Sequence, residues 1–255
     1  MKDLLVRTVS GVVLAVTAVL GVLYLPVWMF KLLVAVLSGV GSWEVFSLLS
    51  KRFNGIKPIL SGMTGFFLSA VLLFFNLYLA IFLIFLFSFY ISHRVYRIDT
   101  LAAYIFGFSY AVFFISSIAI LHEYNRFLVL VLFATVWAGD TMAYFVGKMV
   151  GKHKFAPRLS PKKTWEGALG GIAGSVVLGG VVAYYLEVKD AFIPVVLSAF
   201  LIQIGDLFES FIKRQVGQKD SSNLIPGHGG VLDRIDALIF GAVVFVIYYQ
   251  LSNTL

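Results

Sequence analysis

Long apolar runs are the feature that most limits how this chain can fold. Nine of them follow one another, separated by short polar or turn-forming segments, near 8–25, 27–49, 58–75, 77–92, 101–121, 127–147, 165–186, 191–212 and 231–251. A helix needs about 20 apolar residues to cross the hydrocarbon core of a bilayer. The sequence therefore predicts an all-α, polytopic membrane protein of about nine transmembrane helices.

Composition agrees with a membrane protein. The chain is 60% hydrophobic and 13% charged, whereas soluble domains are roughly 45–50% apolar and about 25% charged. Because there are no cysteines, disulfides and thiolate metal sites are excluded. A net charge of +7 favours anionic lipid headgroups or phosphorylated substrates as partners, and we expect no nucleic acid.

The distribution of positive charge predicts the orientation in the membrane. With nine spans, all of the 20 Lys and Arg residues except Lys31, Arg126 and Lys189 fall on one side, which the positive-inside rule makes cytoplasmic. We therefore expect an inner (plasma) membrane protein with a cytoplasmic N-terminus and a C-terminus outside. Eight spans remain an alternative, because Asn76 is the only polar residue between the third and fourth runs.

The chain changes character near residue 125. Residues 1–125 are apolar with short loops, and we expect them to provide packing and lipid access; a homodimer through the Phe-rich spans 66–115 is a further hypothesis. Residues 126–255 carry two long polar loops, 148–164 and 213–230, and are the expected catalytic domain. The span 165–186 has pairs of glycines four residues apart, which predicts close helix packing.

Acidic residues within the later spans are candidate functional groups. An Asp at the centre of a membrane helix costs about 2.5–3.5 kcal/mol and usually faces the bundle interior or a water-filled cavity. Three such helix ends converge on the cytoplasmic loops, and helical spacing puts their polar residues on shared faces. These sets are Asp140 with Tyr144 and Lys148; Asp206 with Glu209, Ser210 and Lys213; and Asp233 with Asp236.

The alternative is a purely structural role, in which each acid pairs with an Arg or Lys inside the bundle. For Glu44, which is alone in the second span, the functional and structural interpretations both stay open. Glu166 either pairs with a loop lysine or reaches the site. Carboxylates beside many basic residues suit Mg²⁺ shared with substrate phosphates. We predict Asp206 and Asp233 as its ligands, with Asp140 and Asp236 as second choices.

The segment from Ser210 to Asp236 reads SFIKRQVGQKDSSNLIPGHGGVLDRID. Pro226-Gly227 predicts a turn. Gly229 and Gly230 would let backbone N–H groups approach an anion closely, and His228 could donate to a phosphate oxygen. Basic residues frame the segment, and Arg234 between two aspartates could bind phosphate in a bidentate way.

This segment resembles the signature of the phosphatidate cytidylyltransferases, also called CDP-diacylglycerol synthases. Trp137–Tyr144 (WAGDTMAY) and Ser160–Gly167 (SPKKTWEG) are similar to the same family, so the resemblance covers residues 137–236. It implies that CTP and phosphatidate give CDP-diacylglycerol and pyrophosphate with Mg²⁺ as cofactor. A second cation, which could be monovalent, is a further hypothesis for a two-cation displacement.

Site roles follow from the resemblance together with the charge pattern. We expect phosphatidate to enter sideways from the inner leaflet, with its tails in the membrane lipids. The expected catalytic residues are Asp206, Asp233, Lys213, Lys219 and Arg234. The expected substrate-binding residues are Lys148, Ser160, Lys162, Lys163, Arg214, His228, Gly229 and Gly230.

Two other functions compete with this one. A CTP-dependent lipid kinase of the polyprenol or phytol type would transfer the γ-phosphate to an alcohol and release CDP. A cation-coupled transporter would use the buried acids as ion sites, but the chain lacks an evident inverted repeat and its polar loops lie on one side.

Overall fold

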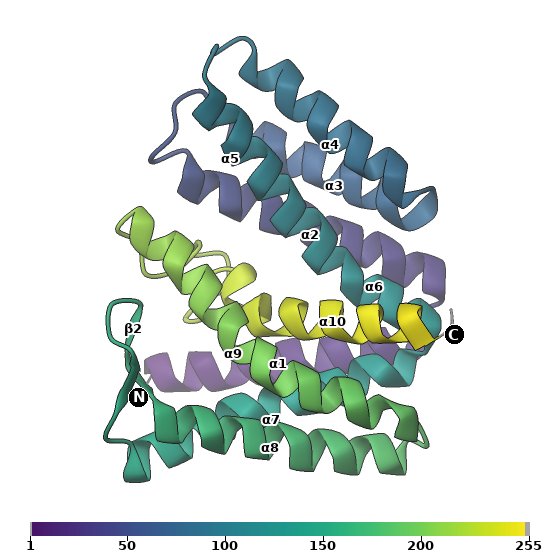
Figure 1. The fold of residues 1–255 in the computed structure, drawn as a ribbon, viewed down its shortest axis with the longest axis vertical. Helices are drawn as coiled ribbons and strands as arrows, with labels where there is room; N and C mark the ends of the chain where they lie inside the picture. The colour runs from purple at the N-terminus through teal and green to yellow at the C-terminus, as the bar shows by residue number, and fades with distance from the viewer. Residues whose placement is uncertain (1, 253–255) are drawn as a thin grey trace. The chain divides into compact units, whose positions relative to one another are not determined.

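Each predicted apolar run forms a helix (Figure 1). The computed structural model describes the backbone of residues 2–252 and the side chains of residues 8–252. The helices are α1 (Lys2–Tyr24), α2 (Val27–Leu49), α3 (Pro58–Phe74), α4 (Leu77–Ser92), α5 (Ile98–Phe108), η1 (Ser109–Phe114), α6 (Ile115–Tyr124), α7 (Arg126–Val150), α8 (Trp165–Tyr185), η2 (Lys189–Ala191), α9 (Phe192–Gln215) and α10 (Leu232–Ser252).

The described helices make this a multi-pass membrane protein. Among residues 2–252, 6 segments are long and apolar enough to cross a bilayer: Val27–Leu49, Ile98–Tyr124, Arg126–Val150, Trp165–Tyr185, Lys189–Gln215 and Leu232–Ser252. Three apolar helices, Thr8–Tyr24, Pro58–Phe74 and Leu77–Ser92, are shorter. The all-α membrane class is confirmed, while the count of nine spans and the orientation of the termini stay predictions.

Asn76 separates the third and fourth apolar runs. Its side-chain oxygen accepts hydrogen bonds from the backbone N–H groups of Tyr78 at 2.7 Å and Leu79 at 3.3 Å, so it caps α4. An N-cap satisfies amides that the first turn of a helix leaves without partners. The two runs are therefore two helices rather than one, as the nine-run division requires.

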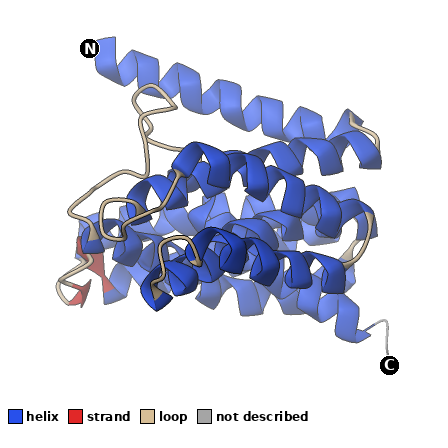
Figure 2. Cartoon of the chain, turned by 90° about the horizontal axis from the view of Figure 1, so that it is seen from above, coloured by secondary structure: helices blue, strands red, loops and turns tan. Residues whose placement is uncertain are grey.

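A small β-hairpin is the exception to the helical fold within the described residues (red in Figure 2). Strands β1 (Lys154–Ala156) and β2 (Ser160–Thr164) pair antiparallel inside the predicted loop 148–164. The ring of Phe155 contacts that of Trp165, the first residue of α8, with centroids 4.5 Å apart. This loop is therefore an ordered element rather than an irregular connection.

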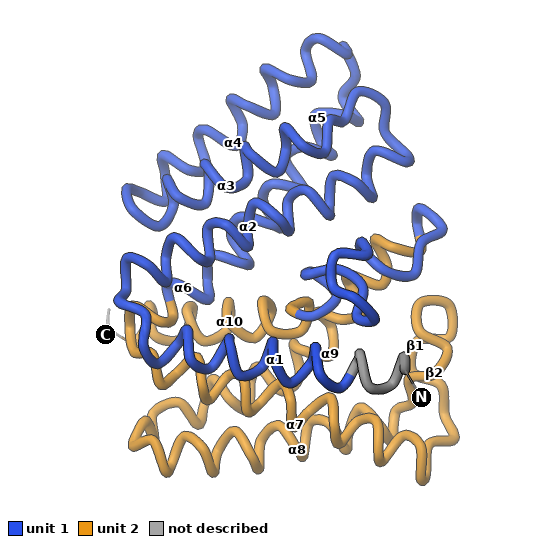
Figure 3. Tube along the Cα trace, turned by 180° about the vertical axis from the view of Figure 1, so that it is seen from behind, with its two compact units in different colours: residues 1–120, 215–234 blue, residues 121–214, 235–255 orange. Residues whose placement is uncertain are grey.

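The chain divides into two compact units, which are coloured separately in Figure 3. Unit 1 comprises residues 1–120 and 215–234, and unit 2 comprises residues 121–214 and 235–255. The loop between α9 and α10 thus packs with the N-terminal helices, far from it in sequence. The predicted division of roles between residues 1–125 and 126–255 stays a prediction.

Unit 1 is built on α2, which contacts α3 and α5. Phe46 of α2 packs against Tyr104 and Phe108 of α5, with ring centroids 5.0 and 4.7 Å away. The long helix that begins with α5 widens into a π-helical segment at Ser109–Phe114. There the hydroxyl of Ser38 donates to the carbonyl of Ala111 at 3.0 Å, in a fully buried position.

In unit 2, glycines allow α8 to lie directly against α7. A Cβ at Gly170 would lie 2.6 Å from the Val146 side chain, and one at Gly174 would lie 2.5 Å from Met142. Real Cβ atoms do not approach that closely, so any larger residue would push the helices apart. The helix-packing role predicted for the small residues of this span is confirmed.

Candidate active site

A cavity of about 490 Å³, with several charged side chains on its wall, opens in unit 2. Helix α7 contributes residues one turn apart, the β-hairpin contributes two lysines, and α9 contributes an acid and an amide. The charged and polar side chains that line it are Asp140, Tyr144, Lys148, Lys162, Lys163, Thr164, Gln203 and Asp206. The predicted face of Asp140, Tyr144 and Lys148 therefore does form one wall of a single cavity.

Asp206 and Lys163 form an ion pair at this cavity. The Nζ atom of Lys163 lies 2.6 Å from Oδ2 of Asp206, and the two side chains are 23% and 36% exposed. The hydroxyl of Ser210, one turn further along α9, donates to Oδ1 of Asp206 at 3.4 Å. The hairpin thus brings a cation to the acid that the sequence analysis ranked first as a metal ligand.

Glu166 fastens the hairpin to the start of α8. Its carboxylate forms a hydrogen bond with Nδ1 of His153 at 2.6 Å and accepts one from the backbone N–H of Lys152 at 3.2 Å. Thr164 caps α8 by accepting the N–H of Gly167 at 3.1 Å. The partner of Glu166 is therefore a histidine and loop amides, rather than the lysine side chain or the cavity that the sequence suggested.

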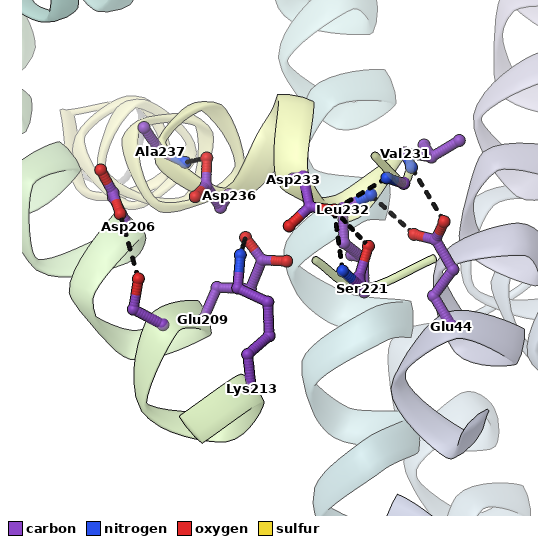
Figure 4. Close-up of polar contacts among 12 residues, drawn as sticks. Glu44, Asp206, Glu209, Lys213, Ser221, Val231, Leu232, Asp233, Asp236 and Ala237 are labelled. Atoms are coloured by element: carbon purple, nitrogen blue, oxygen red, sulfur yellow. Dashed lines mark hydrogen bonds and ion pairs between the residues drawn. The ribbon is translucent and has the colours of Figure 1, made fainter. Parts of the chain in front are cut away.

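Two further acids that the sequence analysis singled out, Glu209 and Asp236, lie on α9 and α10 of unit 2. A Cβ at Gly205 would lie 2.7 Å from the carbonyl oxygen of Asp236, so this glycine lets the two helices approach beside Asp206. Glu209 is 1% exposed and pairs with Lys213 at 3.4 Å. The predicted polar face of α9 thus contains two separate contacts, Ser210 with Asp206 and Lys213 with Glu209 (Figure 4).

The signature loop of unit 1 folds into a tight turn. Ile225 donates to the carbonyl of Gly229 at 2.8 Å, and His228 donates back to Ile225 at 2.9 Å. Gly227 has a φ of +75°, which a type II turn requires after Pro226. The predicted turn is confirmed, and Nδ1 of His228 lies 2.9 Å from the Ser10 hydroxyl of α1.

Asp233 closes this loop onto the first turn of α10 (Figure 4). Its Oδ2 atom accepts the N–H and the hydroxyl of Ser221 at 2.8 and 2.9 Å, and the N–H of Gly230 at 2.7 Å. The N–H of Gly230 does point at an anion, which is this carboxylate. Gly229 has a φ of +80°, and a Cβ there would lie 2.7 Å from Asp233.

Glu44 is the functional candidate that the sequence analysis left undecided. It is fully buried in α2. It accepts the N–H groups of Val231 at 2.9 Å and Leu232 at 2.7 Å, and the hydroxyl of Ser222 at 2.5 Å (Figure 4). A lone acid in an apolar span was the only signal in the sequence, and it carried no information on the partner.

The remaining predicted residues lie outside the lining of the cavity. Ser160 is half-buried in β2, and Arg214, Lys219 and Arg234 are exposed. Asp206 belongs to unit 2 and Asp233 to unit 1. Their pairing as metal ligands, and the catalytic and binding roles of the predicted residues, stay predictions.

Two carboxylates, those of Asp140 and Asp206, line the cavity of unit 2. Among the described residues, no group of three or more His, Asp or Glu side chains converges on one point. Mg²⁺ in nucleotide sites usually takes one or two carboxylates and completes its shell with phosphate oxygens and water. Asp140 and Asp206, which both line the cavity beside lysines, therefore fit a metal that is shared with a polyphosphate.

Known proteins resemble this chain along most of its length. The phosphatidate cytidylyltransferase of Aquifex aeolicus is 34% identical over 246 residues, which are 95% of this chain and 90% of that protein. The proteins of the same name from Brucella abortus and Haemophilus influenzae are 45% and 40% identical. Those two matches cover 56% and 62% of this chain but only 55% and 60% of the relatives' own lengths.

The sequence profile of the cytidylyltransferase family matches residues 5–252. This match includes the N-terminal helices, for which the sequence motifs alone indicated nothing beyond apolar spans. It also includes the cavity of unit 2 and the Asp233 turn of unit 1. Because the profile and the Aquifex relative both extend over nearly all of its residues, the chain belongs to the cytidylyltransferase family.

Proposed function

We propose that this protein transfers CMP from CTP to phosphatidate, giving CDP-diacylglycerol and pyrophosphate. The observation that carries the proposal is the alignment of 95% of the chain with a protein named phosphatidate cytidylyltransferase. The cavity of unit 2 supports it, because three lysines and two aspartates at one opening suit a metal-bound polyphosphate.

The reaction needs charge neutralisation more than proton transfer. A phosphate oxygen of phosphatidate forms a bond to the α-phosphorus of CTP, and the bond from that phosphorus to the β-phosphate bridging oxygen breaks. A phosphomonoester has a second pKa of about 6, so the nucleophile is already largely ionised at neutral pH. The task of the protein is to bring two anions together and to stabilise the leaving pyrophosphate.

The basic side chains divide into three groups by their position. Lys148, Lys162 and Lys163 line the cavity and would hold CTP phosphates there. Lys213 is buried against Glu209, so we assign it to maintaining the charge balance of α9 beside Asp206. The exposed Arg214, Lys219 and Arg234 would meet the phosphates of an arriving substrate.

Mg²⁺ is the cofactor that we propose for the site. Asp206 and Asp140, which both line the cavity, would hold it. The choice of Asp233 as the partner of Asp206, with Asp236 as a second choice, stays a prediction from the sequence. When bound, the ion would neutralise phosphate charge and polarise the α-phosphorus. A second, monovalent cation is part of the same hypothesis.

We place the reaction at the cytoplasmic face of the inner membrane, since both polar loops carry the basic residues that the positive-inside rule keeps in the cytoplasm. Phosphatidate would arrive from the inner leaflet with its tails remaining in lipid. Dimerisation through residues 66–115 stays a hypothesis.

A pyrophosphate-release assay on the purified protein tests the proposal, with CTP, phosphatidate and Mg²⁺ varied independently. We expect release only when all three are present, and none when ATP or GTP replaces CTP. Formation of CDP with a long-chain alcohol would instead identify a lipid kinase. Movement of a solute across vesicles without nucleotide consumption would identify a transporter.

A further inference from the structure

The geometry points to Glu44 as a positioning residue that holds Asp233 in its working orientation from a different helix. The inference rests on the proposed function only in treating Asp233 as part of the reaction site. The family signature does not include the second span, where Glu44 lies. Glu44 is connected to Asp233 through the loop 221–232.

Glu44 acts as a helix cap supplied from outside the helix. The first N–H groups of a helix have no partner within it, and the positive end of its dipole attracts a carboxylate. Glu44 accepts hydrogen bonds from the backbone N–H groups of Val231 and Leu232, which lie at the start of α10. A fully buried carboxylate costs much free energy unless it is hydrogen-bonded, so these contacts keep both partners in place.

Glu44 and Asp233 accept hydrogen bonds from neighbouring residues of the same two segments, 221–222 and 230–232. Of two consecutive serines, Ser221 donates to Asp233 and Ser222 donates to Glu44. Of three consecutive amides, that of Gly230 goes to Asp233, and the next two go to Glu44. Displacing either carboxylate therefore moves the donors of the other.

Gly230 lies between the two carboxylates at a position where no side chain would fit. A Cβ at Gly230 would collide with the Ser221 hydroxyl and with a carboxylate oxygen of Glu44. The N–H of Gly230 donates to Asp233 at 2.7 Å while its side-chain position faces Glu44, so only glycine fits between the two carboxylates. We infer that Glu44 limits Asp233 to one orientation, with one carboxylate oxygen saturated by three donors.

The test compares Glu44→Gln, Ser222→Ala and Ser116→Ala in the full-length protein. Gln keeps the size of Glu but turns an NH₂ group toward backbone N–H donors. Ser222→Ala removes one donor from Glu44 and is the milder change, should Glu44→Gln fail to fold. Ser116→Ala is the matched control, because it deletes a buried hydrogen bond of unit 1, to Ser69 at 2.7 Å, that does not involve the loop.

Two measurements separate positioning from general stability. Amide hydrogen exchange of residues 220–234, recorded without metal, reports on the loop whether or not the enzyme assay works. We expect exchange there to rise at least about tenfold in Glu44→Gln, less in Ser222→Ala and not in Ser116→Ala. The Mg²⁺ concentration for half-maximal activity should rise about tenfold if the competent fraction falls to one tenth.

Each outcome decides the inference. Unchanged exchange in Glu44→Gln would overturn the anchoring role, and faster exchange with an unchanged Mg²⁺ requirement and kcat would overturn the positioning role. A wild-type protein that releases no pyrophosphate would instead refute the proposed function, while the exchange result would still decide whether Glu44 holds the loop.

Discussion

Lys163→Met tests whether Lys163 binds the substrate or only stabilises the fold through its ion pair with Asp206. The pair is short, 2.6 Å, and its side chains are 23% and 36% exposed. Such partly solvated pairs stabilise a fold by about 1 kcal/mol at most. That corresponds to a loss of about 2–4 °C in Tm for a chain of this size, and the Met side chain keeps most of the apolar volume of Lys.

The effect on turnover should be much larger if Lys163 contacts phosphate during the reaction. Removing one group that stabilises developing charge costs about 10²–10³ in kcat, or about 2.7–4 kcal/mol. We therefore expect Lys163→Met to lose about 100-fold or more in pyrophosphate release while its Tm changes by only a few degrees. The discrepancy between the two readouts is the signature of a substrate contact.

Lys154→Met is the matched control for this experiment. Lys154 lies in the same hairpin, is exposed and does not line the cavity, so it should retain activity. If Lys163→Met stayed within about threefold of this control, which is about 0.7 kcal/mol in barrier, the assignment of Lys163 to substrate would be wrong. Parallel collapse of activity and Tm would show instead that the pair is structural.

Three further changes test other parts of the structure. Asp206→Asn should lower turnover at limiting Mg²⁺ by at least about tenfold, and wild-type turnover there would refute the metal assignment. Gly170→Ile should lower the free energy of unfolding in detergent by about 1–3 kcal/mol, since Val146 occupies the space of its side chain; the exposed neighbour Leu169→Ile is the control. Asn76→Ala should cost about 0.5–2 kcal/mol through the lost cap of α4, and a melting curve identical to that of the wild type would contradict that role.

Local patterns predicted the helices well, because a membrane span is identified by its own composition. Each apolar run proved to be a helix, and the one ambiguous break was resolved by the cap at Asn76. The faces of Asp140 with Lys148, and of Asp206 with Lys213, were also predictable from helical spacing alone. Helical periodicity is a local property, so a single sequence contains it.

Contacts between distant segments were not predictable in the same way. The two strands 154–156 and 160–164 carry lysine and proline rather than a β-type alternation, so the loop gave no sign of a hairpin. The link from Glu44 to Val231 joins residues 187 positions apart. Nothing in a single sequence specifies which buried donors a lone acid will find, and this is why its role stayed open.

The π-helical segment at Ser109–Phe114 has a consequence for how variants of this chain should be aligned and built. A π-helical turn accommodates one residue more than an α-helical turn, so removing one residue there would restore a regular helix without breaking it. The helix on either side would keep its rotational phase, because the wide turn absorbs the extra residue. Ser116, which bonds Ser69 of α3 at 2.7 Å, would keep that partner, whereas a deletion in a regular stretch of the same helix would rotate everything after it by about 100°. A relative that is one residue shorter in this helix should therefore be aligned with its gap at Ser109–Phe114.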